Sequence, residues 1–233
     1  SNGCGLVLRQ PSRRSSGLGI CSSNASRKQL SCAQFHSLPN EAILKTRFCG
    51  KMPVETTAIP GLLVIRWPRH DDERGFFRQT YQVGEIARAL GREIRFLQGN
   101  HSRSQARVLR GFHAEPWDKC VYVAHGTATC AVADVRKGSP TFGRAATFVI
   151  GDPPGERVRL FIARGLCNAV YCHTEVDYLN EVSEEFDPSD RAGIIWNDPD
   201  LAVPWPDTAP VLSATDAALP TLRSFCARRG DHL

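Results

Sequence analysis

The chain has 233 residues, 42% of them hydrophobic, which is enough to bury a full core in one domain or in one domain with an extension. It has no apolar run near the roughly 20 residues of a membrane-spanning helix, so we expect a soluble body. Eight of the 29 basic residues but one of the 24 acidic residues lie in residues 1–51, which leaves 21 and 23 in residues 52–233. A nearly neutral body does not indicate a surface that binds nucleic acid.

The first 51 residues differ in composition from the rest of the chain. They are rich in Ser, Arg and Gly and contain no acidic residue before Glu41, so they lack the apolar surface needed to fold alone. We expect a disordered or artefactual extension at 1–51, followed by one domain at 52–233. The extension is either sequence upstream of a true start at Met52, which we favour, or an organellar transit peptide, which has a similar composition.

The body is expected to consist of short strands with few helices. Residues 61–67 are rich in β-branched and apolar side chains between two prolines, and an apolar spacing of three and four residues predicts a helix at 83–90. A second short helix is expected at 216–225. Further strands are predicted at 93–97, 106–112, 119–124, 127–135, 144–150, 157–162 and 176–182. Many short strands separated by Gly, Pro, Asp and Asn indicate an all-β sandwich or barrel.

The nine cysteines show no regular pairing. An odd number of cysteines beside a sizeable core favours free thiols in a reducing compartment, and we expect a cytoplasmic protein. Cys167, Cys172 and His173 come nearest to a metal cluster, but their spacing lies outside the usual zinc pattern, so we expect no metal there. The glycine-rich phosphate loops of Rossmann and P-loop proteins are absent from the sequence.

Residues 109–113 read Leu-Arg-Gly-Phe-His and have strand character. Strand alternation places Gly111 and His113 on one face and Arg110 and Phe112 on the other, unless a bulge at Gly111 turns them. A guanidinium and an imidazole so close together suggest a site, although such a pair is more often part of a solvated strand face.

Several motifs in residues 71–222 occur in an order that closely resembles one family, the dTDP-4-dehydrorhamnose 3,5-epimerases. The matching segments are 72–77 (DERGFF), 98–104 (QGNHSRS), 109–113 (LRGFH) with Lys119, 134–143 (DVRKGSPTFG), 196–199 (WNDP), 205–206 (WP) and 212–216 (LSATD). The resemblance covers roughly two-thirds of the chain. It implies a cupin-type β-jelly roll with short flanking helices, a homodimer, a nucleotide-sugar substrate and no cofactor.

The resemblance also implies roles for particular residues. His113 matches the base that removes the proton next to a sugar ketone, and Asp216 matches the carboxylate that supports it. Without the resemblance, Asp216 would be read as part of a helix cap in Ser213-Ala-Thr-Asp. Lys119 matches the lysine near the keto oxygen, where a cation stabilises an enolate.

Substrate-binding residues follow from the same resemblance. Arg74 and Arg110 match the arginines that grip the diphosphate, for which a planar guanidinium is well suited. Gln98 and Asn100 match polar residues that contact the nucleotide and the sugar. Gln79 stands where the family usually carries glutamate, which keeps hydrogen bonding but removes a charge.

The sequence departs from the family pattern at an accessory pair. The alanine-histidine-glycine segment of the family is Cys167-Asn168-Ala169 here, and the aspartate that pairs with that histidine falls at Cys130. Both members are therefore missing together, which avoids an unpaired buried acid.

A further departure concerns the proton donor. The family's acid tyrosine falls at Asn180, and an amide cannot deliver a proton at a useful rate. Tyr178 lies on the same strand face, but about 6.6 Å away along the strand. A bridging water or a shifted substrate would be needed for Tyr178 to act in its place.

Three activities therefore remain open. We favour epimerisation of a dTDP-4-keto-6-deoxyhexose at C3, C5 or both, as in the biosynthesis of rhamnose-type deoxysugars. The alternatives are a ketoisomerase-type proton shuttle and a cupin that binds sugar nucleotide without turnover. Metal-dependent cupin chemistry at His113-Ala-Glu115 is less favoured, because the segment lacks the second histidine of a cupin metal site. We expect no nucleic-acid or membrane partner.

Overall fold

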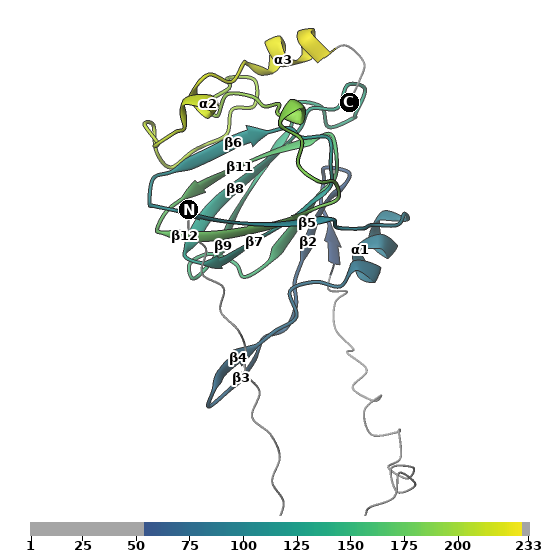
Figure 1. Cartoon of the computed structure of the whole chain (residues 1–233), viewed down its shortest axis with the longest axis vertical. Coiled ribbons are helices and arrows are strands. Elements are labelled where there is room, and N and C mark those ends of the chain that lie inside the picture. The colour runs from purple at the N-terminus through teal and green to yellow at the C-terminus, as the bar shows by residue number, and fades with distance from the viewer. Residues whose placement is uncertain (1–53, 230–233) are drawn as a thin grey trace, which may run out of the picture. The chain divides into compact units, whose positions relative to one another are not determined.

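The computed structural model describes residues 54–229, and the expectation for residues 1–51 lies outside this range (Figure 1). Ten of the strands form two antiparallel sheets. The larger sheet has the order β1 (Val54–Thr56), β2 (Leu62–Ile65), β10 (Arg159–Ile162), β7 (Lys119–His125), β12 (Val176–Val182), β5 (Gln98–Ser104). The smaller sheet has the order β6 (Leu109–His113), β11 (Leu166–Cys172), β8 (Thr127–Asp134), β9 (Ala145–Gly151).

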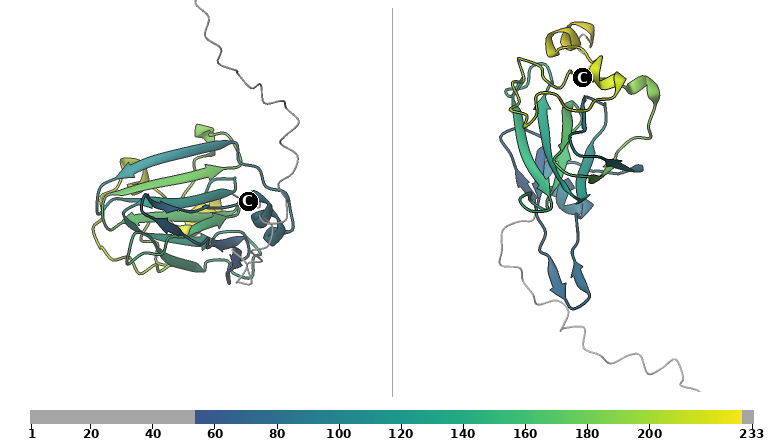
Figure 2. Two further views of the ribbon diagram at one scale, coloured as in Figure 1. Left: turned by 90° about the horizontal axis from the view of Figure 1, so that it is seen from below. Right: turned by 90° about the vertical axis from the view of Figure 1, so that its left-hand side faces the viewer.

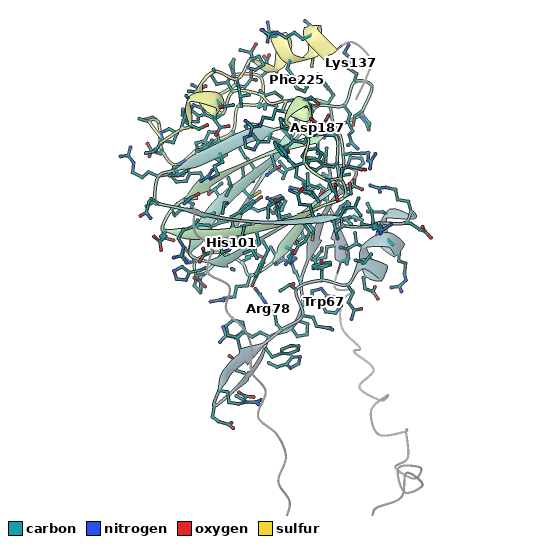
Figure 3. The ribbon with its side chains drawn as sticks, viewed as in Figure 1. Trp67, Arg78, His101, Lys137, Asp187 and Phe225 are labelled. Carbon is teal, nitrogen blue, oxygen red and sulfur yellow. The ribbon has the colours of Figure 1, made fainter. Side chains whose placement is uncertain are left out.

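Two apolar cores lie on the two faces of the smaller sheet. One core lies between the sheets and includes Val132 and Val170, while the other lies on the outer face of the smaller sheet, around Ala131 and Ala169. The C-terminal segment covers that outer face, with Phe225 of α3 (Leu222–Arg229) packed in the second core (Figure 3). Every residue of β8 and β11 is buried for this reason.

The C-terminal segment also pairs with the edge of the smaller sheet. Backbone hydrogen bonds join Phe112 of β6 to Ile194 in both directions, and Leu109 N–H donates to the carbonyl of Val211. The segment then enters the short helix α2 (Ala214–Ala217), which packs against β6. Residues more than 100 positions apart in the sequence are thereby brought next to each other.

A separate hairpin lies between β2 and α1 (Val83–Leu90) in the chain. Strands β3 (His70–Asp72) and β4 (Gly75–Phe77) pair only with each other and stand clear of both sheets in Figures 1 and 2. The side chains of Phe76 and Phe77 at its end are exposed. Helix α1 follows, and η1 (Pro188–Asp190) lies after β12.

The structure is the predicted all-β, cupin-type jelly roll with short helices, although some predicted elements differ. The helix at 83–90 and the strand at 176–182 are confirmed. The strand predicted at 93–97 is wrong, because the polar segment Gln98–Ser104 forms β5 instead. The single helix predicted at 216–225 is two helices, separated by a stretch that contains Pro220. Among the helices of residues 54–229, none is long and apolar enough to cross a membrane.

Candidate active site

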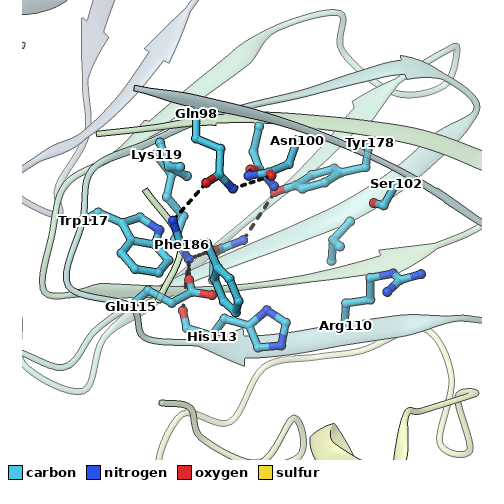
Figure 4. A pocket seen from close by; sticks show the side chains of 14 residues that line it. Gln98, Asn100, Ser102, Arg110, His113, Glu115, Trp117, Lys119, Tyr178 and Phe186 are labelled. Atoms are coloured by element: carbon cyan, nitrogen blue, oxygen red, sulfur yellow. Dashed lines mark hydrogen bonds and ion pairs between the residues drawn. The ribbon is translucent and has the colours of Figure 1, made fainter. Parts of the chain in front are cut away.

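A cavity of about 330 Å³ lies between the two sheets (Figure 4). Its walls come from β5, β7 and β12 of the larger sheet and from β6 and β11 of the smaller sheet. Strands β5 and β6 are edge strands of their sheets. The volume lies in the range of small-ligand sites, and both charged and aromatic side chains line it.

A bulge in β6 turns both predicted functional residues of that strand into the cavity. Asn168 of β11 lies opposite His113, and Val170 lies opposite Arg110, so two residues of β6 face Ala169 alone. Arg110 and His113 both line the cavity, whereas Phe112 packs in the second core. The prediction from simple alternation is therefore wrong, and the stated exception, a bulge at Gly111, is confirmed.

Gly111 is required at this bulge for two reasons. Its φ of +114° is a conformation that side chains with a Cβ rarely adopt, and a Cβ there would lie 2.6 Å from the carbonyl oxygen of Asn168. The backbones of β6 and β11 thus approach each other closely beside the cavity. The glycine in Leu-Arg-Gly-Phe-His is what allows a guanidinium and an imidazole three positions apart to share one face.

His113 is held by Asp216. Its Nε2 lies 2.8 Å from Oδ1 of Asp216, which is buried at the start of α2. Ser213 caps that helix, since its Oγ accepts from the Asp216 N–H at 3.0 Å, so the segment provides both a cap and a carboxylate for the histidine. Burial alone would raise the pKa of Asp216, but the hydrogen bond and the charge interaction with His113 and the hydrogen bond from Ser213 lower it below the usual value.

This contact determines the tautomer of the imidazole. An ionised carboxylate can only accept a hydrogen bond, so Nε2 of His113 must carry a proton. In the neutral imidazole Nδ1 is then left with a lone pair. His113 lines the cavity and can take a proton there through Nδ1.

Lys119 lies in the cavity wall, where the carboxylate of Glu115 neutralises its charge. Its ammonium forms an ion pair with Glu115 and donates to Oδ1 of Asn168 at 2.8 Å. The side chain is only 7% exposed. A buried cation needs such partners, and a group that develops negative charge nearby would find the ammonium already in place.

Tyr178 reaches the same cavity from the opposite sheet. Its hydroxyl accepts a hydrogen bond from Nδ2 of Asn168 at 3.4 Å. Burial raises its pKa well above the usual value, an effect that nearby Cys130 and Glu115 reinforce, so the phenol keeps its proton at neutral pH. A protonated phenol from β12 therefore faces a cavity that His113 enters from β6.

Asn180 belongs to a chain of hydrogen-bonded amides. Its Oδ1 accepts from Nδ2 of Asn100 at 2.8 Å, and Oδ1 of Asn100 accepts from Gln98 at 2.7 Å. Gln98 in turn accepts from the backbone N–H of Phe186 at 2.9 Å. These predicted residues line one wall of the cavity and present polar groups suited to a ribose, a sugar or a base.

Arg110 brings a guanidinium to the cavity wall, and its charge contributes to the lowered pKa of Asp216. Its Nε donates to Oγ of Ser104 at 2.9 Å. The residue itself is exposed, while its side chain reaches the cavity wall. This arrangement suits an anionic group that enters from solvent.

Two predicted binding residues do not reach the cavity within one chain. Arg74 lies on the hairpin, its side chain is 82% exposed, and it pairs with Asp72. Gln79 lies in a crevice on another part of the chain, beside Arg78 and Tyr122. The other predicted residues either line the cavity or, in the case of Asp216, contact a residue that does.

The sequence alone does not reveal the contacts of two cavity residues. It presents Glu115 as part of a possible metal motif and Asn168 as a departure from the family pattern. A signal for Glu115 was present, because it lies two positions after His113 on the same side and four before Lys119. For Asn168 no local signal exists, since its partners Lys119 and Tyr178 come from two other strands.

Cys167 and Cys172 pack in different cores, on opposite faces of β11, so their thiols cannot share one ion. Within residues 54–229 no group of three His, Cys, Asp or Glu side chains is arranged to hold a metal ion. The cysteines of this part of the chain are free thiols.

Comparison with known proteins identifies the family. Residues 56–224 match the model of the family described as dTDP-4-dehydrorhamnose 3,5-epimerase. The dTDP-4-dehydrorhamnose 3,5-epimerase of Salmonella typhimurium is 36% identical over 178 residues, which are 73% of this chain and 96% of that protein. The dTDP-4-dehydrorhamnose 3-epimerase of Streptomyces niveus is 34% identical over 171 residues, which are 71% of this chain and 81% of that protein.

Solved structures give the same result. A 4-keto-6-deoxy sugar epimerase from the novobiocin biosynthetic gene cluster of Streptomyces spheroides matches with a TM-score of 0.73 and 29% identity, over 78% of this chain and 92% of that chain. An epimerase from Legionella pneumophila in complex with dTDP-4-keto-L-rhamnose matches with a TM-score of 0.68 and 32% identity, over 73% of this chain and 92% of that chain. From the family match, the identities and the shared fold, we conclude that this chain belongs to the dTDP-4-dehydrorhamnose 3,5-epimerase family.

Proposed function

We propose that the protein epimerises a dTDP-4-keto-6-deoxyhexose at C3, C5 or both, without a cofactor. The observation that carries this proposal is the position of His113 and Tyr178 in one cavity. His113 comes from the smaller sheet with a carboxylate behind it, and Tyr178 comes from the larger sheet as a protonated phenol. Inversion of a carbon needs a base on one side of the sugar and a proton donor on the other.

The chemistry follows from these groups. Nδ1 of His113 takes the proton from the carbon next to the C4 ketone, and the electrons of that C–H bond move into an enolate whose negative charge lies on the ketone oxygen. The ammonium of Lys119 stabilises that oxygen. Tyr178 then gives its proton to the opposite face of the carbon while the C4 ketone reforms, and the phenolate regains a proton from solvent as His113 releases its own.

The proposed substrate rests on the family and on the cavity. Family members of known structure bind dTDP-4-keto-L-rhamnose, in the Legionella pneumophila enzyme, and dTDP-quinovose, in a 3'-monoepimerase from Streptomyces bikiniensis. Arg110 offers its guanidinium to the diphosphate, and the amides of Gln98 and Asn100 offer hydrogen bonds to the nucleotide and the sugar. We place the reaction in the biosynthesis of rhamnose-type deoxysugars and in the cytoplasm, where free thiols persist.

A homodimer gives the hairpin residues a role. The β3–β4 hairpin exposes Phe76 and Phe77 and carries Arg74 away from the cavity of its own chain. In a dimer in which the hairpin of each copy docks on the sheets of the other copy, Phe76 and Phe77 are covered. Arg74 and Gln79 then approach the substrate of the second copy.

Sedimentation equilibrium measures the oligomeric state directly. The wild type is expected to be a dimer and a Phe76→Ser, Phe77→Ser variant a monomer, whereas a wild-type monomer would contradict the proposal.

Proton exchange tests the proposed activity. The protein is incubated with dTDP-4-keto-6-deoxyglucose in deuterated water, and deuterium at C3 and C5 and the configuration of the product are followed by NMR. Deuterium with inversion at either carbon supports epimerisation and shows which carbon reacts. Conversion to a 3-keto sugar would instead support the ketoisomerase. No exchange with intact binding would leave only sugar-nucleotide binding.

Arg110→Ala tests substrate binding separately from proton transfer. It removes the guanidinium that would contact the diphosphate and leaves His113, Asp216 and Tyr178 in place. We expect a rise in KM of about 10-fold to 100-fold, with a smaller change in kcat. An unchanged KM would remove Arg110 from the proposed binding site.

A further inference from the structure

Asn168 connects Lys119 and Tyr178 through the two ends of its side-chain amide. Oδ1 accepts from the Lys119 ammonium at 2.8 Å, and Nδ2 donates to the Tyr178 hydroxyl at 3.4 Å. The orientation of this amide is fixed by chemistry, because an ammonium can only donate and therefore requires the amide oxygen. The nitrogen must then face the phenol.

This orientation determines where the phenol proton points. A hydroxyl oxygen that accepts from Nδ2 cannot direct its own proton to the same atom. Within residues 54–229 no group accepts a hydrogen bond from the Tyr178 hydroxyl, and Tyr178 lines the cavity. The proton is therefore available to a group inside the cavity.

Asn168 is itself held in place. It lies in the middle of β11, paired with Val132 of β8 on one side and with His113 of β6 on the other. The residue is buried, and its carbonyl oxygen lies against the backbone of Gly111. The amide thus has a fixed frame from which it can orient two side chains of the other sheet.

We propose that Asn168 is a positioning residue that turns the proton of Tyr178 toward the substrate and holds the ammonium of Lys119 beside it. This proposal rests on the proposed epimerase function and deepens it. It gives Tyr178 the orientation that a proton donor needs, in a chain whose usual acid position is occupied by Asn180. An amide does not relay protons, so Asn168 acts only through its two partners.

Asn168→Asp tests the orientation because it reverses one hydrogen bond with little change in size. A carboxylate at this position accepts from Lys119 as before, but it also accepts from Tyr178, whose proton is then drawn away from the cavity. Tyr178→Phe is the control. It removes the phenol proton and leaves the hydrogen bond from Lys119 to Asn168 in place.

The readout is a ratio that a merely structural role would not change. In deuterated water, His113 can return a deuteron to the carbon without inversion, while inversion needs Tyr178. For Asn168→Asp we expect inverted product to fall at least 10-fold relative to deuterium exchange in the unepimerised sugar. Adding Asn168→Asp to Tyr178→Phe should lower the ratio no further. An equal fall of both rates in Asn168→Asp, or a further fall in the double variant, would overturn the proposal.

A second measurement needs no turnover and separates this proposal from the proposed function. The ζ-carbon resonance of ¹³C-labelled Tyr178 is assigned by its loss in Tyr178→Phe. In Asn168→Asp it should move downfield, because a phenol that donates to a carboxylate becomes more phenolate-like. An unchanged resonance would overturn the role of Asn168 even in an active enzyme. A wild type that neither exchanges nor inverts would refute the proposed function, and the resonance would still decide how Asn168 orients the phenol.

Discussion

Glu115 and Lys119 place two opposite charges side by side in the cavity wall, and both side chains are largely removed from solvent. Such a pair is costly to break from one side, since the remaining charge keeps its desolvation cost without its partner. The pair therefore couples the stability of the fold to the charge that the proposed reaction uses.

A double-mutant cycle measures this coupling. Glu115→Gln leaves the Lys119 ammonium without its counterion and should lower the free energy of unfolding by about 3 kcal/mol. Lys119→Met should also lower the free energy of unfolding, because it leaves the Glu115 carboxylate buried without its counterion. The double variant should lose less than the sum of the two single losses in urea unfolding. Additive losses would mean that the two charges do not interact in solution.

Asp216 is expected to control the tautomer of His113. In Asp216→Asn the amide can donate to Nε2, which moves the imidazole proton to Nδ1 and removes the base from the cavity. By analogy with a carboxylate that orients a catalytic histidine, exchange should fall by about 10³-fold to 10⁴-fold. Deuterium incorporation measured by NMR checks this.

The control for this variant is Ser213→Ala, which removes the helix cap but keeps the carboxylate. It should cost about 1 kcal/mol of stability and have little effect on exchange. Wild-type exchange in Asp216→Asn would show that His113 does not depend on the carboxylate.

At the scale of elements, the bulge of β6 decides which side chains enter the cavity. Gly111→Ala adds a Cβ that meets the Asn168 carbonyl oxygen at 2.6 Å and Ala169 at 2.8 Å. We expect a loss of about 3 kcal/mol or more, or a shift of β6 that removes His113 from its place. Urea unfolding and the exchange assay measure the two effects.

Gly75→Ala is the matched control for Gly111→Ala. Gly75 has a similar φ of +124°, but a Cβ there meets nothing within 4 Å. The Gly75→Ala variant should therefore lose only the free energy that the backbone conformation costs, which is about 1 kcal/mol. Equal losses in the two variants would mean that the close approach of β6 and β11 contributes nothing.

Elements were predictable from the sequence where local patterns decide them. Helix α1 shows its apolar spacing, and β2 its β-branched and apolar residues between two prolines. The segment Gln98–Ser104 has no β-branched or aromatic residue, and it becomes a strand because β12 pairs with it along its whole length. The site residues divide in the same way, into those that a local pattern reveals and those that depend on contacts between distant segments. The His113 block was visible locally, whereas the partnership of Asp216 with His113 came only from the resemblance, and the bridge made by Asn168 depends on strands that meet only in the folded chain.

For the whole molecule, acid stability depends on buried carboxylates such as Asp134, at the end of β8. It accepts from Arg136, Ser139 and Thr141. Burial would raise its pKa, but these hydrogen bonds lower it to about 2. Because the pKa is lower in the folded than in the unfolded chain, the stabilisation is present above about pH 4 and is lost as the pH falls to about 2.

Asp134→Asn removes this titration. The variant should be less stable than the wild type at pH 7, and the difference should shrink by about 2 kcal/mol between pH 4 and pH 2. Unfolding by urea across this pH range measures the difference between the two proteins, so that other carboxylates cancel. A difference that does not change with pH would show that Asp134 titrates alike in both states.

The central claim is that His113 removes the proton next to the sugar ketone. The most direct measurement is the rate at which solvent deuterium enters C3 and C5 of dTDP-4-keto-6-deoxyglucose in the wild type and in His113→Ala, with dTDP affinity measured for both. The account predicts exchange in the wild type, none detectable in His113→Ala, and nearly equal affinities. Exchange in His113→Ala at the wild-type rate would contradict it.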